Sequence, residues 1–344
     1  MADKTLRAWE PGIDLLRCIG LLFVNALHAF LYNGFYYEHQ TELILWGANS
    51  FRWLFFTCNG IFMILTGYLK TATPWGKKYY KSLWLVLIGY LLTCVISFPI
   101  RHFLIGEHLT LLQWLEKMVT FANYAWYIEM YIGLLLISPF INLALDKLNT
   151  KQQTLLALTM VILTAVPTVT PLNIAPDYWT ALYPLTYYTL GAVIQRCRPS
   201  IHPLLALVVV LLTVCGLGLT TLLTTDAGFS KGYGQGYGGF WITLAVVFLL
   251  LSVYRLRIPK GAARVLRWLS GGCFEGYILS RLFDVWIYGQ FPQWHSPEKY
   301  PLIFICVTIP VFIVSILSGK LVHSLSVRLY NWITAFFRQR SVKT

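Results

Sequence analysis

The chain has 344 residues, of which 57% are hydrophobic and only 12% are charged, and its mean hydropathy is +0.62. Soluble domains are about 45–50% apolar and about 25% charged, so this composition excludes an ordinary soluble protein and indicates a membrane protein. The formal net charge of +13 does not indicate a nucleic-acid partner, because the basic residues occur in short segments between hydrophobic runs.

Runs of about 20 apolar residues are long enough to cross a hydrocarbon core of ~30 Å. By this criterion the sequence predicts an all-α, polytopic protein, with residues 1–344 forming a single integral-membrane domain. The ten predicted transmembrane helices are 13–34, 44–69, 81–102, 124–145, 152–170, 178–196, 202–223, 238–254, 268–290 and 301–322. A short interfacial helix is expected within 103–123. The alternation of apolar and basic residues over 321–340 predicts a C-terminal amphipathic helix.

The basic residues between the spans predict the orientation of the chain. They fall in every second connection, whereas the intervening connections hold very few of them. Because basic residues accumulate on the cytoplasmic side, this alternation places both termini in the cytoplasm. The basic residues are Lys4, Arg7, Lys70, Lys77, Lys78, Lys81, Lys147, Lys151, Arg196, Arg198, Arg255, Arg257, Lys260, Arg264, Arg267, Lys320, Arg328, Arg338, Arg340 and Lys343.

Metal and disulfide chemistry are not indicated by the cysteines. All seven stand singly, mostly within apolar runs, and none shows CxxC spacing. We therefore expect neither a disulfide framework nor a metal site. The first hydrophobic run is too long for a signal-peptide core and lacks a small-residue cleavage site after it, so we expect it to be retained as a helix.

The first predicted span, "GIDLLRCIGLLFVNALHAF", carries polar residues at membrane depth, where charges are costly and usually functional. Arg17 and His28 are 11 residues apart, which is close to three helical turns, so both lie on one face about 16 Å apart along the axis. Asp14 precedes Arg17 by three residues and can pair with it. Asn25 lies one turn before His28.

The predicted topology places residues of two other spans at the depth of His28. Arg52 lies in the outer third of the second span, and Glu129 lies about five residues into the fourth. A base, a cation and a carboxylate at one level can form a reaction centre, with His28 as the general base.

Each of these residues also has a structural interpretation. Asp14 and Arg17 can be an ion pair at a helix entrance, and His28 can be a hydrogen-bonding group between helices. Arg52 can anchor the outer interface by extending its charged end toward water.

Taken together, these stretches resemble the membrane-bound acyltransferase family 3, whose members are surface-glycan O-acyltransferases. Asp14, Arg17 and His28 are similar to the entry motif of that family, an aspartate, then an arginine, ten residues and a histidine. The second span resembles the family in its arginine, its aromatic run and its ending Thr66-Gly67-Tyr68. Further similar segments are "WGKKYYKSLWLVLIGYLL", "YAWYIEMYIGLLLISPFIN" and "YPLTYYTLGAVI". The resemblance covers nearly the whole chain and is strongest over 12–142.

The ninth span, with "CFEGYILSRLFD", departs from this resemblance. The family often has a histidine after a Tyr-Leu pair, and here the neighbourhood holds Ser280 and Arg281. Arg281 and Asp284 are spaced as a structural pair. The role of Glu275 is left open.

The resemblance implies that an acyl group, most often acetyl, moves from cytoplasmic acyl-CoA to a hydroxyl of an extracytoplasmic glycan or related acceptor. It implies a bacterial inner or plasma membrane, with membrane lipids around the chain and no metal. The catalytic candidates are His28, Arg17, Glu129 and Arg52. The donor-binding candidates are Arg17, Asp14, Lys77, Lys78, Lys81 and Tyr68. The acceptor-binding candidates are Asn25, Trp126, Tyr127, Tyr233 and Tyr237.

Several alternatives stay open at this point. Tyr233, Tyr237 and Trp241 stand among glycines and can stack on sugar rings, but they also fit a mobile loop with interfacial anchors. A transporter or flippase for a glycan or lipid-linked intermediate is the main competing class, and a membrane scaffold is the third. The chain shows no internal repeat or broken-helix pattern of the kind found in many transporters. Succinyl is an alternative to acetyl.

Overall fold

The computed structural model describes residues 9–32, 35, 43, 45–120, 126–169, 175–224, 236–288 and 300–341. The regular structure in these residues is entirely helical, which confirms the predicted all-α class. In chain order, with η marking 3-10 or π segments, the elements are α1 (Pro11–Tyr32), α2 (Leu45–Phe56), α3 (Cys58–Lys70), α4 (Lys77–Ile100), η2 (Arg101–Ile105), α5 (Leu111–Val119), α6 (Trp126–Lys147), α7 (Thr150–Thr164), η3 (Val166–Thr168), η4 (Asp177–Leu182), α8 (Tyr183–Cys197), α9 (Pro203–Thr224), α10 (Phe240–Val253), α11 (Lys260–Ser270), α12 (Cys273–Phe283), η5 (Asp284–Tyr288), α13 (Tyr300–Ile303), η7 (Phe304–Thr308) and α14 (Ile309–Ser341).

Every predicted span coincides with a helix or a run of consecutive helical segments. Within the described ranges, five helices are long and apolar enough to cross a membrane, which supports a membrane protein. Their bounds are Pro11–Tyr32, Tyr79–Phe103, Trp126–Lys147, Pro203–Leu223 and Phe304–Phe336. Crossing by the other predicted spans stays a prediction.

Several predicted spans are interrupted in the structure, among them the second, the fifth at Ala165, and the ninth. The second is divided at Thr57, whose hydroxyl donates to the Leu54 carbonyl at 2.6 Å and so competes with the helical hydrogen bonds. The ninth is divided between α11 and α12 at Gly271 and Gly272. A Cβ atom at Gly272 would lie 2.5 Å from the backbone nitrogen of Lys320, so α14 approaches too closely for any larger residue.

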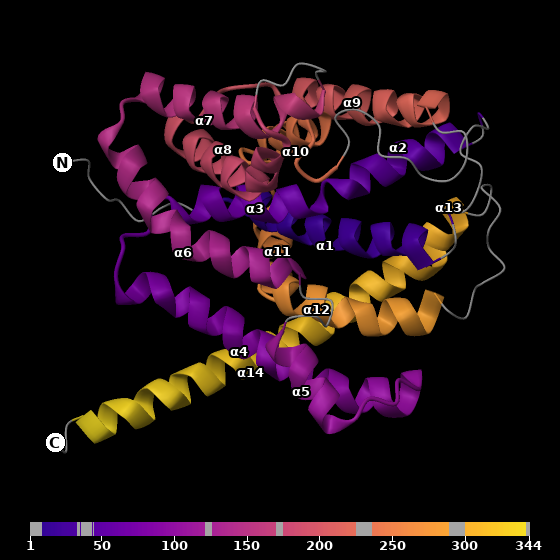
Figure 1. Cartoon of the computed structure of the whole chain (residues 1–344), viewed down its shortest axis with the longest axis vertical. Helices are drawn as coiled ribbons and strands as arrows, with labels where there is room; N and C mark the ends of the chain where they lie inside the picture. The colour runs from indigo at the N-terminus through magenta and orange to yellow at the C-terminus, as the bar shows by residue number, and fades with distance from the viewer. Residues whose placement is uncertain are drawn as a thin grey trace.

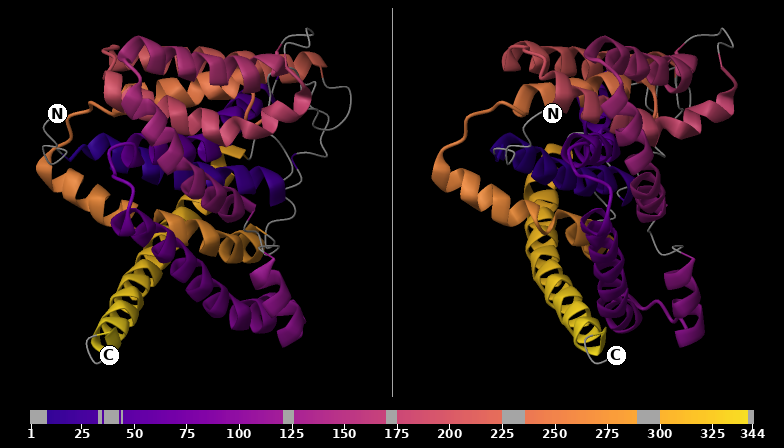
Figure 2. Two further views of the ribbon diagram at one scale, coloured as in Figure 1. Left: turned by 60° about the vertical axis from the view of Figure 1, so that its left-hand side comes forward. Right: turned by 90° about the vertical axis from the view of Figure 1, so that its left-hand side faces the viewer.

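The predicted C-terminal amphipathic helix is not a separate element. Residues 321–340 continue α14, which runs unbroken from Ile309 to Ser341. The far part of α14 extends away from the other helices in Figure 1 and in the left view of Figure 2. The short helix expected within 103–123 is present as α5, which begins with a capping box between Thr110 and Gln113.

Helix α1 lies in the middle of the molecule. It packs against α2, α3, α10, α11, α12 and α14. Helices α7 to α10 gather on one side of it, and α4, α12 and α14 lie on the other (Figures 1 and 2). The polar residues of α1 can therefore reach both groups of helices.

Small residues set the closest helix contacts. A Cβ atom at Gly67 of α3 would lie 1.9 Å from the Tyr188 carbonyl oxygen, and one at Gly191 of α8 would lie 1.9 Å from the Ile64 carbonyl oxygen. The backbones of α3 and α8 thus touch at a crossing that only glycine permits, as in many membrane helix pairs.

We expect Gly191→Val to destabilise the protein by about 1–3 kcal/mol, because the new side chain must separate α8 from α3. The measurement is the thermal midpoint of the purified protein in detergent. Gly133→Val on α6 is the matched control, because nothing lies within 4 Å of a Cβ atom there. Equal midpoints for the two variants would contradict the close crossing.

Candidate active site

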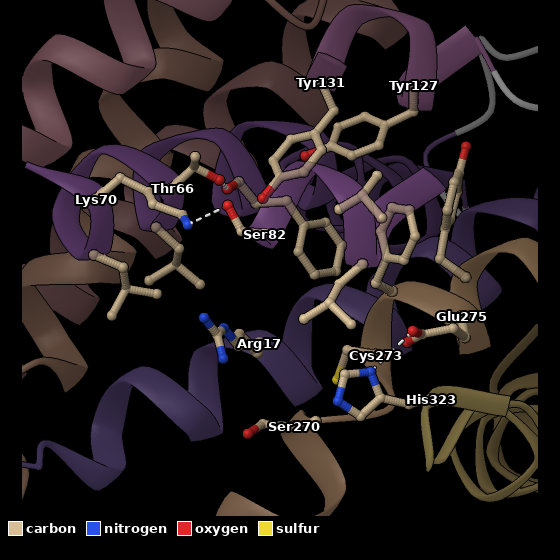
Figure 3. Close-up of a pocket in the computed structure, with 18 residues that line it drawn as sticks. Arg17, Thr66, Lys70, Ser82, Tyr127, Tyr131, Ser270, Cys273, Glu275 and His323 are labelled. Carbon is tan, nitrogen blue, oxygen red and sulfur yellow. Dashed lines mark hydrogen bonds and ion pairs between the residues drawn. The ribbon is translucent and has the colours of Figure 1, made fainter. Parts of the chain in front are cut away.

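A cavity of about 350 Å³ lies between α1, α3, α4, α6, α12 and α14 (Figure 3). Most of its wall is apolar or aromatic, and a few polar groups converge on it, which is typical of a ligand site. The residues that line it include Arg17, Lys70, Ser82, Tyr127, Glu275, Tyr277 and His323.

Two cations line this cavity. The Arg17 side chain projects from α1, is 35% exposed, and lies 3.9 Å from the Asp14 carboxylate, so the pairing expected from their spacing is present. Lys70 ends α3, and its Nζ donates to Ser82 Oγ of α4 at 2.6 Å. An anionic group in the cavity would meet both positive charges.

Asp14 itself is buried beside the cavity. Its carboxylate accepts hydrogen bonds at 2.6 Å from Trp9 Nε1 and from Ser270 Oγ of α11. These contacts tie α1 to α11. Arg17 is the member of the pair that lines the cavity, while Asp14 is engaged by Trp9 and Ser270.

A histidine and a carboxylate meet at a second place, near the opposite end of α1. His28 Nδ1 lies 2.5 Å from Asp284 Oδ2, and the Asp284 side chain is 0% exposed. Tyr32 lies edge-on to the His28 ring, with ring centres 6.2 Å apart. This contact engages Nδ1 and fixes the orientation of the His28 ring.

The cavity and the His28–Asp284 pair are joined by the packing of α1 against α12. Three contacts join α1 to α12 and to η5, which follows it, and in each the two residue numbers differ by 255 or 256. The contacts are Cys18 with Cys273, Leu21 with Gly276 and His28 with Asp284. The two helices therefore run parallel and in register. Their Arg17 ends border the cavity, and their other ends carry the pair. Within the described part of the chain, the cavity wall does not include His28.

The other two catalytic candidates lie elsewhere. Glu129 is exposed on the first turn of α6, and Asp284 occupies the place beside His28 that the sequence suggested for Glu129. Arg52 is 0% exposed, and its guanidinium carbon lies 4.0 Å from the centre of the Trp53 ring. Arg52 is thus packed inside the protein rather than extended to the interface.

Of the remaining donor-binding candidates, Tyr68 and Lys81 are described, and neither lines the cavity. The buried Tyr68 hydroxyl donates to Glu10 at 2.8 Å and accepts from Arg198 at 2.8 Å, which joins α3 to the end of α8. Lys81 is exposed, with Nζ 5.3 Å from the Tyr330 ring centre. Lys77 and Lys78 begin α4, and their side chains are outside the described part of the chain.

The acceptor-binding candidates lie at several different places. Asn25 is buried with its amide 3.2 Å from Ser315 Oγ, so it joins α1 to α14. Tyr127 lines the cavity. Trp126 and Tyr237 do come together, with ring centres 5.5 Å apart. Tyr233 falls outside the described residues.

Tyr237 also stacks on Phe56, with ring centres 4.1 Å apart and planes 5° from parallel. Trp126, Tyr237 and Phe56 therefore form one aromatic cluster, which joins α2, α6 and the segment before α10. The side chain of Trp126 is 43% exposed, so part of this cluster is open to a ligand or to lipid.

Sequence reasoning missed four residues of the two sites. Asp284 was interpreted as a partner of Arg281, because helical spacing predicts contacts within one helix but not across helices. Glu275 was left open, and His323 was included in the predicted amphipathic tail. Lys70 was treated only as a topology signal. Glu275 and Asp284 could have been found from the sequence, because acidic residues inside a predicted span are usually functional.

One of three comparisons with known proteins identifies a family. No curated protein and no solved structure matches the chain. A model of the acyltransferase family 3, described as an acyltransferase domain, matches residues 10–320. That range holds Arg17, His28, Glu275 and Asp284 and covers most of the sequence, so the chain belongs to acyltransferase family 3.

Proposed function

We propose that this acyltransferase moves an acyl group from cytoplasmic acyl-CoA across the membrane to a hydroxyl of a glycan or related acceptor. Acetyl is the first candidate for the acyl group. The observation that carries the proposal is the pairing of α1 with α12, which holds a cationic cavity at one end and the His28–Asp284 pair at the other. Family membership favours acyl transfer over transport.

The cavity suits the donor in charge and in shape. Arg17 and Lys70 would attract the phosphates of coenzyme A, and a guanidinium binds phosphate oxygens well. The apolar and aromatic wall would hold the extended arm that carries the thioester. Arg17 and His28 lie about 16 Å apart along α1, so an extended arm is needed to join them.

His28 would act as the general base at the end of that arm. Asp284 holds Nδ1 and sets the ring orientation, so Nε2 would take the proton of the acceptor hydroxyl as its oxygen attacks the thioester carbonyl. The C–O ester bond forms, the C–S bond breaks, and the leaving thiolate takes the proton back from His28. The chain would thus regain its starting state.

The oxyanion formed during attack needs a hydrogen-bond donor. The Asn25 amide contacts Ser315 Oγ, and the Arg52 guanidinium lies over the Trp53 ring; neither residue lines the cavity. The Tyr127 hydroxyl is buried, and no hydrogen-bond partner for it lies among the described residues. Since Tyr127 lines the cavity, its hydroxyl would donate to the thioester oxygen.

The acceptor would bind at the aromatic cluster of Phe56, Trp126 and Tyr237. Aromatic faces stack on the apolar faces of sugar rings, and Trp126 adjoins Tyr127 with ring centres 6.0 Å apart. A glycan held there would lie next to the residue proposed for the oxyanion.

The proposal is tested by mass spectrometry of the host's surface glycans. We expect an acyl mass with the wild-type protein and none without the protein or with His28→Ala, because the variant lacks the base. Western blotting of the membrane fraction controls for expression. Identical glycans in all three strains, with the protein present, would refute the proposal and favour transport.

We expect Asp284→Asn to lower the initial rate of glycan acylation about 100-fold or more, because the imidazole loses the carboxylate that orients it and stabilises its charge. Glu129→Gln is the comparison, and its effect should be much smaller. Rates are measured in membrane vesicles at saturating donor. A larger loss in Glu129→Gln than in Asp284→Asn would contradict the orienting role of Asp284.

We expect Arg17→Ala to raise the KM for acyl-CoA about tenfold or more while kcat changes little, because the phosphates lose a charged partner. Arg264→Ala is the matched control, since Arg264 is an exposed cation of α11 that does not line the cavity. An unchanged KM in Arg17→Ala would remove Arg17 from the donor site.

A further inference from the structure

Glu275 is a buried carboxylate with one engaged oxygen and one orphaned oxygen. Its residue is 2% exposed, and its Oε1 lies 2.9 Å from His323 Nδ1 of α14. Its Oε2 is buried, and no hydrogen-bond partner for it occurs in the described part of the chain. Both Glu275 and His323 line the cavity (Figure 3).

An orphaned carboxylate oxygen in such a place indicates a missing donor. Burying it without a partner is costly, and nearly all buried acceptors in proteins are satisfied. The neighbouring helix makes room for the carboxylate, because a Cβ atom at Gly89 would lie 3.0 Å from Oε1. His323 engages Oε1, so Oε2 is the oxygen of this cavity-lining carboxylate that a ligand group could satisfy.

The register of α1 and α12 locates Glu275 along the proposed route. Because paired residues differ in number by 255 or 256, Glu275 is level with Gly20. It therefore lies about 4.5 Å beyond Arg17 in the direction of His28. A ligand whose anionic end is at Arg17 would present its next segment to Glu275.

The chemistry of the carboxylate selects that segment. Phosphate oxygens accept hydrogen bonds and carry negative charge, so Glu275 repels them. An amide N–H or a hydroxyl can donate to Oε2, and the pantetheine arm of coenzyme A carries both kinds of group after its phosphates.

We propose that Glu275, positioned by His323, accepts a hydrogen bond from an N–H or O–H of the pantetheine arm and so sets how deep the donor enters. This inference rests on the proposed use of acyl-CoA. It adds a specificity-determining residue on α12, with a partner at position 323 that lies beyond the matched family range.

The test compares two ligands by isothermal titration calorimetry with the full-length protein in nanodiscs. Coenzyme A has the arm, and 3′-phosphoadenosine 5′-diphosphate has the same phosphates without it. We expect Glu275→Ala to raise the Kd of coenzyme A about 10- to 100-fold, as for a lost hydrogen bond to a charged group. The Kd of the nucleotide should stay within about twofold. Glu116→Ala, which removes an exposed carboxylate of α5, should change neither.

Glu275→Gln provides a second variant of nearly the same size, in case the alanine variant does not fold. Its neutral amide oxygen is a weaker acceptor, so we expect a several-fold rise in the Kd of coenzyme A alone. An unchanged Kd in either folded variant, or equal weakening of both ligands, would overturn the inference. A wild-type protein that does not bind coenzyme A would instead refute the proposed function, and the inference with it.

Discussion

The contact between His28 and Asp284 constrains much of the molecule around it. A carboxylate with no exposed surface, inside a protein that lies in lipid, is tolerated only when a partner is fixed beside it. His28 is that partner because α12 and η5 lie alongside α1 with the chain running in the same direction. The register that follows also places Glu275 and Tyr277 beside the cavity near Arg17.

The same register requires close approach on the other side of α12. A Cβ atom at Gly276 would lie 2.7 Å from the Ser315 carbonyl oxygen, and one at Gly319 would lie 2.3 Å from the Gly272 carbonyl oxygen. Glycines on both helices therefore let α14 pack tightly against α12. This packing brings His323 to Glu275, so the second histidine–carboxylate contact depends on the same arrangement as the first.

Polar groups between these helices divide into two classes. Asp14 with Ser270, Asn25 with Ser315, and Tyr68 with its two charged neighbours satisfy each other and hold helices together. Glu275 Oε2 and the Tyr127 hydroxyl are buried and lack such partners among the described residues. Burial alone does not separate structure from function here, because both classes are buried. Glu275 and Tyr127 combine an unsatisfied buried atom with a place in the cavity wall, and that combination distinguishes them.

This division explains how much of the structure could be predicted from the sequence. Apolar length predicted where helical segments lie, and the spacing of Arg17 and His28 predicted two ends of one helix face, because both depend on residues near in sequence. The breaks at Thr57 and Gly272, the continuous α14 and the partner of His28 depend on which helices become neighbours. Hydropathy does not contain that information, so Asp284 was joined to Arg281 and His323 was placed in a surface tail.

Under the proposed function, the charges along the α1–α12 pair favour one orientation of the donor, with its phosphates at Arg17 and its acyl end toward His28. Arg17 and Lys70 would hold the phosphates at one end, while the orphaned carboxylate of Glu275 would repel them from going further. The uncharged arm is then the part of the donor that can pass Glu275 and Tyr127 toward His28. Arg17 on α1 and the buried acceptor Glu275 on α12 would thus hold the nucleotide at one end and let the arm with the thioester continue toward His28. Such an arrangement lets an acyl group reach the far side while the carrier stays on the side where it is made.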